Sequence, residues 1–365
     1  MNATVFTVML LGPSLNAVSG VSTHLNQLFR SSLANEFNLM HFQVGSEGQK
    51  ESAISRSKRF LFSPIQFFWQ LVWRKPQIIH LNTSLVPKSF WRDIVYLFVA
   101  RIMGKKIVYQ VHGGALPQVF FVNNKLLTSL LKLVLSSTDV VVLLAQEELH
   151  AYRNFEPSLY LEVIPNAIEM GADAQWKKTP TAPGQLLRLV YVGRLTENKG
   201  IFEIIEALRI VRSHNRNIEL VVAGSGPEED KLRIRVKDLG LSDYVNFVGA
   251  VFGEEKKHIW EQADLFIFPT YHEGLPYTLL ESMAARTPPV VCPVGAIPDV
   301  IEDGVHGVFV PSRNPEALAI AIERLDNDRA LICLMGEAGR QRVEDYYTIA
   351  RLAGDFRRVY YKLLS

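Results

Sequence analysis

The chain has 365 residues, of which 48% are hydrophobic and 21% are charged. This length and composition predict two globular domains with separate cores, and they exclude a low-complexity or disordered protein. The net charge of +2 is unevenly distributed, because residues 1–182 carry +6 and the remaining residues carry −4. Such an asymmetry between the halves requires a functional explanation.

Cysteine usage and hydropathy exclude further classes of protein. The two cysteines, Cys292 and Cys333, stand among apolar neighbours, so we expect buried thiols in a reducing compartment, with no disulfide framework and no metal-binding spacing. The apolar run at residues 5–11 follows no basic segment, so we expect no signal peptide. No uninterrupted apolar stretch in the sequence reaches the roughly 18–20 residues that a membrane-spanning helix needs.

Short apolar runs alternate with helical patterns along the whole chain. In the first half, strands are predicted near residues 4–11, 38–42, 77–81, 106–111, 138–143 and 161–164, and helices near 20–34, 64–74, 89–103, 125–136 and 145–153. In the second half, strands are predicted near residues 188–192, 218–223, 245–248, 264–268, 289–292 and 307–310, and helices near 200–214, 228–239, 254–262, 277–286 and 314–325.

This alternation predicts an α/β fold with two doubly wound, Rossmann-like parallel sheets. Residues 171–184 are rich in Ala, Thr, Pro and Gly and are predicted to link two domains. Open α/β sheets bind their ligands at the carboxyl ends of the strands. The loops that follow the predicted strands are therefore the places to look for a site.

Residues 270–281 carry two acids around a predicted helix start. Glu273 lies in the loop after an apolar strand, and Glu281 lies about one turn into the following helix. A helix N-terminus offers unpaired N–H groups and partial positive charge, which suit a phosphate. Flanking carboxylates suit hydroxyl-bearing groups such as a sugar and a ribose. The alternative is an acidic helix start with a solvated glutamate.

The loop after the first strand of the second half carries two cations. Arg194 and Lys199 flank this loop, and together they could neutralise a diphosphate, with arginine as a planar fork and lysine as a point charge. The alternative is a solvated basic loop. In the loop after the next strand, Gly224 and Gly226 allow close approach of a ring or phosphate, although the pattern also fits a plain turn. The backbone at Val248 could contact a nucleobase edge.

The first half offers weaker signals. Gly20 opens a helix and could approach a phosphate, but the Gly-x-Gly-x-x-Gly fingerprint of dinucleotide-binding proteins is absent from this loop. His112 ends a strand before two glycines; it could bind a substrate hydroxyl or act as a general base, or it could be structural. Asp326-Asn327-Asp328 matches the Asp-x-Asp motif of metal-dependent transferases, but its place after a helix indicates a surface helix end and no metal site.

The loops of the second half carry four features in one order: Gly193-Arg194-Leu195 with Lys199-Gly200, Gly224-Ser225-Gly226-Pro227, Phe247-Val248-Gly249, and Glu273 with Glu281 eight positions later. Together they resemble the family-4 glycosyltransferases, which are retaining enzymes of the GT-B fold. The resemblance covers most of the chain and is strongest over residues 187–311.

The resemblance implies two domains. Residues 1–168 would bind the acceptor, residues 169–346 would bind a nucleotide-diphosphate sugar, with UDP preferred over GDP, and the helix at 347–365 would cross back to the first domain. It implies that Arg194 and Lys199 hold the diphosphate. It also implies that Glu281 binds the ribose, and that Glu273 binds the donor sugar beside the N–H groups of Gly274 and Leu275. Gly20 would approach the phosphates, and His112 would lie near the reacting sugar. The nucleotide would be contacted by Gly193, Gly224, Gly226 and Val248. The resemblance implies no metal or other cofactor.

The implied reaction transfers a sugar, with retention, to a hydroxyl of a saccharide or lipid-linked saccharide in cell-surface polysaccharide synthesis. The alternatives are an inverting transferase or phosphorylase of the same fold, and a non-catalytic sugar-nucleotide binder. Basic residues alternate with aromatic residues at 58–75, 90–92 and 105–106. This pattern favours peripheral contact with an anionic membrane surface on its cytoplasmic face over a solvated face above a core. No nucleic-acid-binding motif accompanies it.

Overall fold

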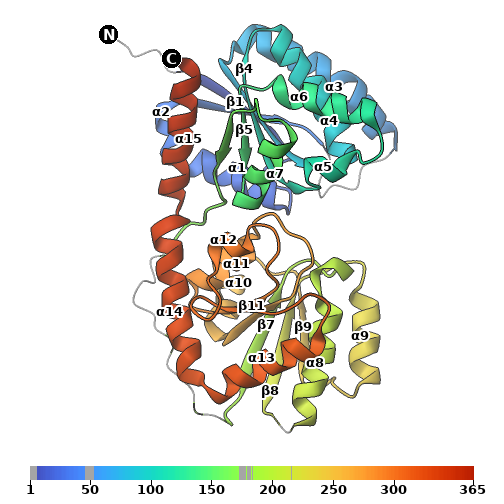
Figure 1. Cartoon of the computed structure of the whole chain (residues 1–365), viewed down its shortest axis with the longest axis vertical. Coiled ribbons are helices and arrows are strands. Elements are labelled where there is room, and N and C mark those ends of the chain that lie inside the picture. The colour runs from blue at the N-terminus through green and yellow to red at the C-terminus, as the bar shows by residue number, and fades with distance from the viewer. Residues whose placement is uncertain (1–5, 46–52, 172–177, 179–181, 183, 215) are drawn as a thin grey trace. The chain divides into compact units, whose positions relative to one another are not determined.

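The structure is a computed structural model of the chain. It describes residues 6–45, 53–171, 178, 182, 184–214 and 216–365, with residues 53–61 described by their backbone only. The chain forms two compact units, one comprising Met1–Glu169 with Thr348–Ser365 and the other comprising Met170–Tyr347. We refer to them as the first unit and the second unit, and each has its own parallel sheet (Figure 1).

The first unit is built on a six-stranded sheet in the order β2-β1-β3-β4-β5-β6. Its strands are β1 (Thr7–Gly12), β2 (Asn38–Gln43), β3 (Ile78–Leu85), β4 (Lys106–Gly114), β5 (Val140–Leu143) and β6 (Leu161–Val163). Its helices are α1 (Gly20–Arg30), α2 (Leu33–Glu36), α3 (Ala53–Arg74), α4 (Pro87–Ile102), α5 (Pro117–Phe120), α6 (Lys125–Ser136), α7 (Gln146–Phe155) and α15 (Ile349–Leu364).

Both faces of this sheet are buried. Successive strand residues point to opposite faces, so Met9 of β1 joins the hydrophobic cluster that includes residues of α3, α4 and α6, while its neighbour Leu10 joins the cluster that includes residues of α1 and α15. Burial on both sides explains why the strands are continuous apolar runs. The helix predicted near 64–74 begins earlier, at Ala53, because Pro64 is accommodated inside α3 instead of starting it.

The C-terminal helix α15 packs on the first unit, as predicted, beside α1 and α2 (Figure 1). Phe356 and Tyr360 are fully buried in the core. Arg351 donates to the carbonyl oxygen of Pro165 at 2.8 Å, and Arg357 pairs with Glu36 at the end of α2. These contacts join residues more than 180 positions apart in the sequence.

The second unit is built on a second parallel sheet in the order β12-β11-β10-β7-β8-β9. Its strands are β7 (Leu187–Val192), β8 (Ile218–Ala223), β9 (Val245–Gly249), β10 (Leu265–Phe268), β11 (Pro289–Val291) and β12 (Val308–Phe309). Its helices are the 3-10 turn η1 (Glu197–Lys199), α8 (Ile201–Ser213), α9 (Glu229–Asp238), α10 (Gly253–Gln262), α11 (Tyr277–Ala284), α12 (Ile297–Val300), α13 (Pro315–Asn327) and α14 (Arg329–Tyr346).

The predicted fold class is confirmed, because both sheets are parallel and their helices connect successive strands. The expectation of two buried thiols is wrong in one respect: Cys292 is buried but Cys333 is partly exposed, and both thiols are free. Most of the predicted linker lies outside the described residues. Among the helices that the structure describes, none is both long enough and apolar enough to cross a bilayer.

Candidate functional site

The loops at the carboxyl edge of the second sheet are joined to one another by backbone hydrogen bonds. The strand order places β11, β10, β7, β8 and β9 side by side, so the loops that follow them meet. The joining N–H···O bonds are Ala296 to Gly274 at 2.9 Å, Tyr271 to Asn198 at 2.9 Å, Leu195 to Ser225 at 3.0 Å and Gly224 to Gly249 at 2.6 Å. This edge is therefore a continuous and mutually supported surface.

Two glycines permit this close packing of loops. A Cβ at Gly224 would lie 1.8 Å from the carbonyl oxygen of Gly193, and a Cβ at Gly295 would lie 2.0 Å from that of Glu273. Gly295 also has a φ of +58°, in the left-handed region that favours glycine. Loop packing thus accounts for Gly224 as a structural residue. The predicted ligand contacts of Gly193, Gly224, Gly226 and Val248 stay predictions.

An ion pair between Lys199 and Glu273 is the centre of this edge. Lys199 ends η1 and Glu273 lies in the loop after β10, and the lysine Nζ contacts the glutamate Oε1. Their side chains are only 13% and 12% exposed. The Thr270 hydroxyl donates to the same Oε1 at 3.2 Å. The structure thus brings together two of the predicted site residues, 74 positions apart in the sequence.

Arg194 lies in the same loop as Lys199. The Tyr191 hydroxyl donates to the Arg194 carbonyl oxygen at 2.6 Å and so fixes the loop backbone. Burial and the nearby Glu273 carboxylate raise the pKa of Tyr191, so the phenol keeps the proton that it donates. The Arg194 side chain is exposed, and no hydrogen bond or ion pair joins its guanidinium to any residue in the described ranges. Its five donors face solvent.

Glu281 lies on α11, which follows the Glu273 loop. Its Oε1 is 2.6 Å from the Nζ of Lys256 on α10. Its Oε2 is shielded from solvent, and no residue among those described hydrogen-bonds to it. The first turn of α11 has Pro276 at its N-cap and no side-chain cap. The N-terminus of this helix therefore keeps its positive character at the same edge of the sheet.

Two predicted site residues lie in the first unit. Gly20 is the first residue of α1, behind Ser19, whose hydroxyl accepts from the Ser22 N–H at 3.2 Å. Near the end of β4, the Nε2 of His112 lies 3.0 Å from the Asn82 Oδ1. A carbonyl oxygen only accepts, so Nε2 carries the proton and Nδ1 is an acceptor.

Burial lowers the pKa of His112 to about 3, so the ring is neutral near pH 7. A group with so low a pKa is a weak base at that pH. The geometry thus favours the hydrogen-bonding role over the general-base role, and either role stays a prediction. The predicted approach of Gly20 and His112, both in the first unit, to a donor bound by the second unit also stays a prediction.

Sequence reasoning missed the side-chain contacts that hold the Glu273 loop through Tyr271. The Tyr271 hydroxyl donates to Glu203 in the first turn of α8, and the Arg313 guanidinium lies 4.8 Å from the centroid of the tyrosine ring. Burial and the Glu203 carboxylate raise the pKa of Tyr271. These side chains line an open pocket of about 510 Å³, whose other lining residues are Glu197, Phe202, Glu228 and Lys231. No local motif marks this support, because it joins residues 68 positions apart.

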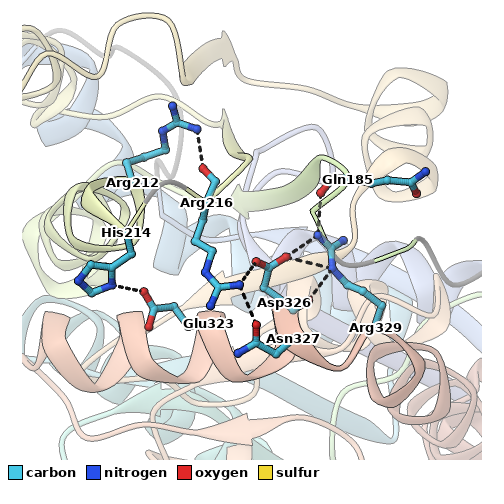
Figure 2. A network of polar contacts seen from close by, with 8 residues as sticks. All are labelled: Gln185, Arg212, His214, Arg216, Glu323, Asp326, Asn327 and Arg329. Atoms are coloured by element: carbon cyan, nitrogen blue, oxygen red, sulfur yellow. Dashed lines mark hydrogen bonds and ion pairs between the residues drawn. The ribbon is translucent and has the colours of Figure 1, made fainter.

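The Asp326-Asn327-Asp328 tripeptide is fully used by the fold. Figure 2 shows Arg216 and Arg329 converging on Asp326, at 3.2 and 2.5 Å. The expectation of a surface helix end is wrong for Asp326, which is buried because these two guanidinium groups replace water around it. Asp328 caps α14 by accepting from the Leu331 N–H at 3.0 Å. Across the described part of the chain, no group of three or more His, Cys, Asp or Glu residues could hold a metal ion.

Comparison with known proteins identifies the second unit. Residues 173–342 match the family described as "Glycosyl transferases group 1". This part of the chain belongs to that family. The resemblance to family-4 glycosyltransferases inferred from the four loop features is therefore confirmed. The group 1 match covers the loops that carry Arg194, Lys199, Glu273 and Glu281.

Curated glycosyltransferases match part of the chain. An uncharacterised glycosyltransferase of Methanocaldococcus jannaschii is 34% identical over 173 residues, which are 47% of this chain and 44% of that protein. The amylovoran biosynthesis glycosyltransferase AmsK of Erwinia amylovora is 36% identical over 166 residues, 44% of this chain and 41% of that protein. The chain thus spans less than half of the length of these relatives. A GDP-mannose-dependent mannosyltransferase of Mycobacterium tuberculosis is 28% identical over 250 residues, 63% of this chain and 64% of that protein.

Solved structures share the fold over nearly the whole chain. HepE of Anabaena, in complex with UDP and glucose, superposes with a TM-score of 0.77 at 14% identity, covering 98% of this chain and all of that one. Sucrose-phosphate synthase of Thermosynechococcus elongatus gives 0.75 at 21% identity, covering 98% and 99%. At these identities the likeness concerns the fold alone, and that fold is GT-B.

Proposed function

We propose that the chain is a glycosyltransferase that moves a sugar from a nucleotide-diphosphate sugar to a hydroxyl of a saccharide or lipid-linked saccharide, with retention of the anomeric configuration. The observation that carries this proposal is the Lys199–Glu273 pair, fixed at the carboxyl edge of a group 1 glycosyltransferase unit. Relatives named for amylovoran and capsular polysaccharide biosynthesis support a role in cell-surface polysaccharide synthesis.

The proposed chemistry follows from charge. Negative charge develops on the departing diphosphate, and Arg194, Lys199 and the N-terminus of α11 would stabilise it more in the transition state than in the ground state. Glu273 would hold a donor-sugar hydroxyl, with the backbone N–H groups of Gly274 and Leu275 beside it. Because these groups supply the positive charge, we propose that no metal ion is required. Activity that disappears in EDTA and returns with Mg²⁺ would contradict this part of the proposal.

The donor is proposed to be a UDP-sugar in preference to a GDP-sugar. The mycobacterial relative is named for GDP-mannose and the HepE structures contain UDP and UDP-glucose, so both nucleotides belong in the test. UDP-glucose, UDP-galactose and GDP-mannose are each added to the protein in a thermal melt. At a ligand concentration of 100 Kd, binding contributes about 2.7 kcal/mol of stability, which shifts the melting temperature measurably. The slow hydrolysis of the stabilising donor is then measured from the release of its nucleotide diphosphate.

These measurements separate the proposal from its alternatives. Binding without any turnover, with or without a saccharide acceptor, would indicate a non-catalytic sugar-nucleotide binder. The configuration of the released or transferred sugar, read by NMR before mutarotation, distinguishes retention from inversion. A retained anomeric centre is expected, and an inverted one would refute that part of the proposal.

We further propose that the first unit contacts a membrane surface through α3. Large apolar side chains recur on this helix at Phe62, Ile65, Trp69 and Trp73, three or four residues apart, and all are exposed, with Trp73 at 74%. The opposite face of α3 buries Phe67 in the core. A helix that is apolar on its solvent side as well as its core side exposes more apolar surface than folding requires.

The chemistry at the end of this apolar stripe favours an anionic bilayer. Arg74 and Lys75 follow Trp73 directly and are exposed. Aromatic rings insert at the headgroup level while cations attract anionic lipids. Binding is expected to phosphatidylglycerol vesicles at low salt and to be lost when Trp69 and Trp73 are both replaced by serine. The control variant Ile234→Ser changes an exposed apolar residue of the second unit and should bind the vesicles like the parent. Equal binding by the parent, the double tryptophan variant and Ile234→Ser would overturn this proposal.

A further inference from the structure

The two oxygens of the Glu281 carboxylate have different surroundings. Oε1 is 2.6 Å from the Lys256 Nζ, whereas Oε2 is buried without a hydrogen-bond partner among the residues that the structure describes. Leaving a buried acceptor unsatisfied is unfavourable, and native proteins rarely tolerate it without a reason. A ligand hydroxyl that reached this oxygen would supply the missing hydrogen bond.

In the described part of the chain, the ammonium group of Lys256 makes the only hydrogen bond or ion pair to this carboxylate, and it thereby fixes the orientation of the group. It comes from α10, whereas Glu281 comes from α11, so the pair joins helices that flank strand β10. The carboxylate torsion of a glutamate is broad, and without the ammonium group the plane of the carboxylate could rotate. With the ammonium group in contact with Oε1, Oε2 is kept in one position.

We propose that Lys256 is a positioning residue for a nucleoside subsite, in which the Glu281 Oε2 accepts hydrogen bonds from the vicinal hydroxyls of a ribose. This inference rests on the proposed function, because it requires a nucleotide donor. Lys256 acts through Glu281 and touches no reacting atom. Its side chain is 30% exposed and that of Glu281 is 22% exposed, although the Oε2 of Glu281 is itself shielded from solvent.

A purely structural ion pair makes a different prediction. A partly exposed ion pair contributes little to stability, and its loss would weaken the binding of all ligands equally or of none. A positioning role instead makes the loss specific to ligands that carry the ribose hydroxyls. The informative quantity is therefore the ratio of dissociation constants for a 2′,3′-dideoxynucleotide and the matching ribonucleotide.

The experiment measures this ratio by calorimetry with UDP and 2′,3′-dideoxy-UDP, and with GDP and 2′,3′-dideoxy-GDP if the protein binds guanosine nucleotides. In the parent protein the ratio is expected to be about 10–100, the value of one hydrogen bond to a charged group. In Lys256→Met the ratio should fall at least fivefold. Glu281→Gln should lower it as well, and Lys256→Arg, which keeps a cation, should restore most of it.

The neighbouring lysine gives a matched control. Lys257 is one position away and pairs loosely with Glu261 on its own helix, at 3.9 Å, so Lys257→Met should keep the parent ratio. A melting temperature within about 2 °C of the parent value establishes that each variant is folded. If Lys256→Met fails this criterion, Lys256→Gln replaces it.

The outcomes separate two failures. A parent ratio near 1 means that Glu281 does not bind the ribose, which refutes that role in the proposed function and the inference with it. A parent ratio of tenfold or more that is unchanged in Lys256→Met leaves the proposed function intact and overturns the inference alone. Binding of neither UDP nor GDP refutes both.

Discussion

Replacing Lys199 with alanine tests the electrostatic core of the proposed function. The substitution removes the cation that contacts Glu273 and leaves the carboxylate, at 12% exposure, with the Thr270 hydroxyl as its remaining hydrogen-bond partner among the described residues. Two consequences are expected. Turnover falls because the departing diphosphate loses a fixed positive charge, and stability falls because a largely buried carboxylate loses its ion pair.

Both effects have expected sizes. Removing one preorganised charge contact from a transition state costs about 2–4 kcal/mol, which is roughly a 30- to 1,000-fold loss of turnover. The unpaired carboxylate should lower the free energy of unfolding by about 1–3 kcal/mol, the range for an unsatisfied buried polar group. For a unit of this size, that corresponds to a fall in melting temperature of about 2–10 °C. The protein should therefore remain folded at 25 °C.

The assay follows release of the nucleotide diphosphate from the donor that gives the largest thermal stabilisation, with circular dichroism as the folding control. Lys231→Ala is the matched control variant, because Lys231 also pairs with a glutamate, Glu228 at 2.7 Å, but lies on α9 beside the open pocket. Its turnover should stay within about twofold of the parent, since a surface pair contributes little. Lys199→Ala with parent turnover would refute the assignment of Lys199 to the diphosphate.

Three further predictions concern groups outside this pair. Burial lowers the pKa of His80 and of His112 to about 3, so the unfolded chain binds more protons than the folded chain below about pH 6.5. The free energy of unfolding should therefore fall as the pH is lowered from about 6.5 to 3, by up to about 1.4 kcal/mol per pH unit for each histidine. Urea titrations at several pH values measure this dependence, and the free energy of unfolding of His80→Gln should change less with pH. Tyr271→Phe keeps the ring beside the Arg313 guanidinium but loses the hydrogen bond to Glu203. Turnover should fall about 5- to 10-fold, which is a loss of about 1–1.5 kcal/mol of transition-state stabilisation, with an unchanged donor KM. Turnover equal to that of the parent would exclude Tyr271 as a support of the Glu273 loop. Asp326→Asn should destabilise the second unit by about 3–5 kcal/mol, because the buried guanidinium group of Arg329 loses the Asp326 carboxylate; calorimetry measures this loss, and a variant that Mg²⁺ restores would point to metal binding instead.

Much of the fold could be predicted because both sheets are buried on both faces. The apolar runs at residues 189–192 of β7 and 220–223 of β8 have no polar face, which is typical of strands covered by helices on both sides. The candidate loops followed from the same reasoning, since the carboxyl ends of neighbouring parallel strands share one edge. This is why Lys199 and Glu273 could be placed in one site from the sequence and are found in contact.

The missed features depend on tertiary contacts or on ambiguous helix signals. The partners of Glu281 and Tyr271 are 25 and 68 positions away, and nothing in the local pattern selects them. Helix α14 was missed because Asp328 ends one helix signal and caps the next helix, so two helices follow each other without a loop. Pro64 resembles a helix start but lies inside α3, since a proline removes only one hydrogen bond and a long helix can tolerate a local kink.

The two acids of the candidate site share one design. In each, a lysine contacts Oε1: Lys199 for Glu273 and Lys256 for Glu281. In the described part of the chain no hydrogen bond reaches Oε2 of either acid, although the threonine beside Glu273 also binds Oε1. A carboxylate with one oxygen anchored by a lysine keeps its other oxygen without a hydrogen-bond partner in the described chain, so a ligand hydroxyl can supply the missing bond. Since a sugar and a ribose lie on opposite sides of a diphosphate, two such acids after β10, together with the cations of the loop after β7, suit the ends of one nucleotide sugar better than two separate ligands.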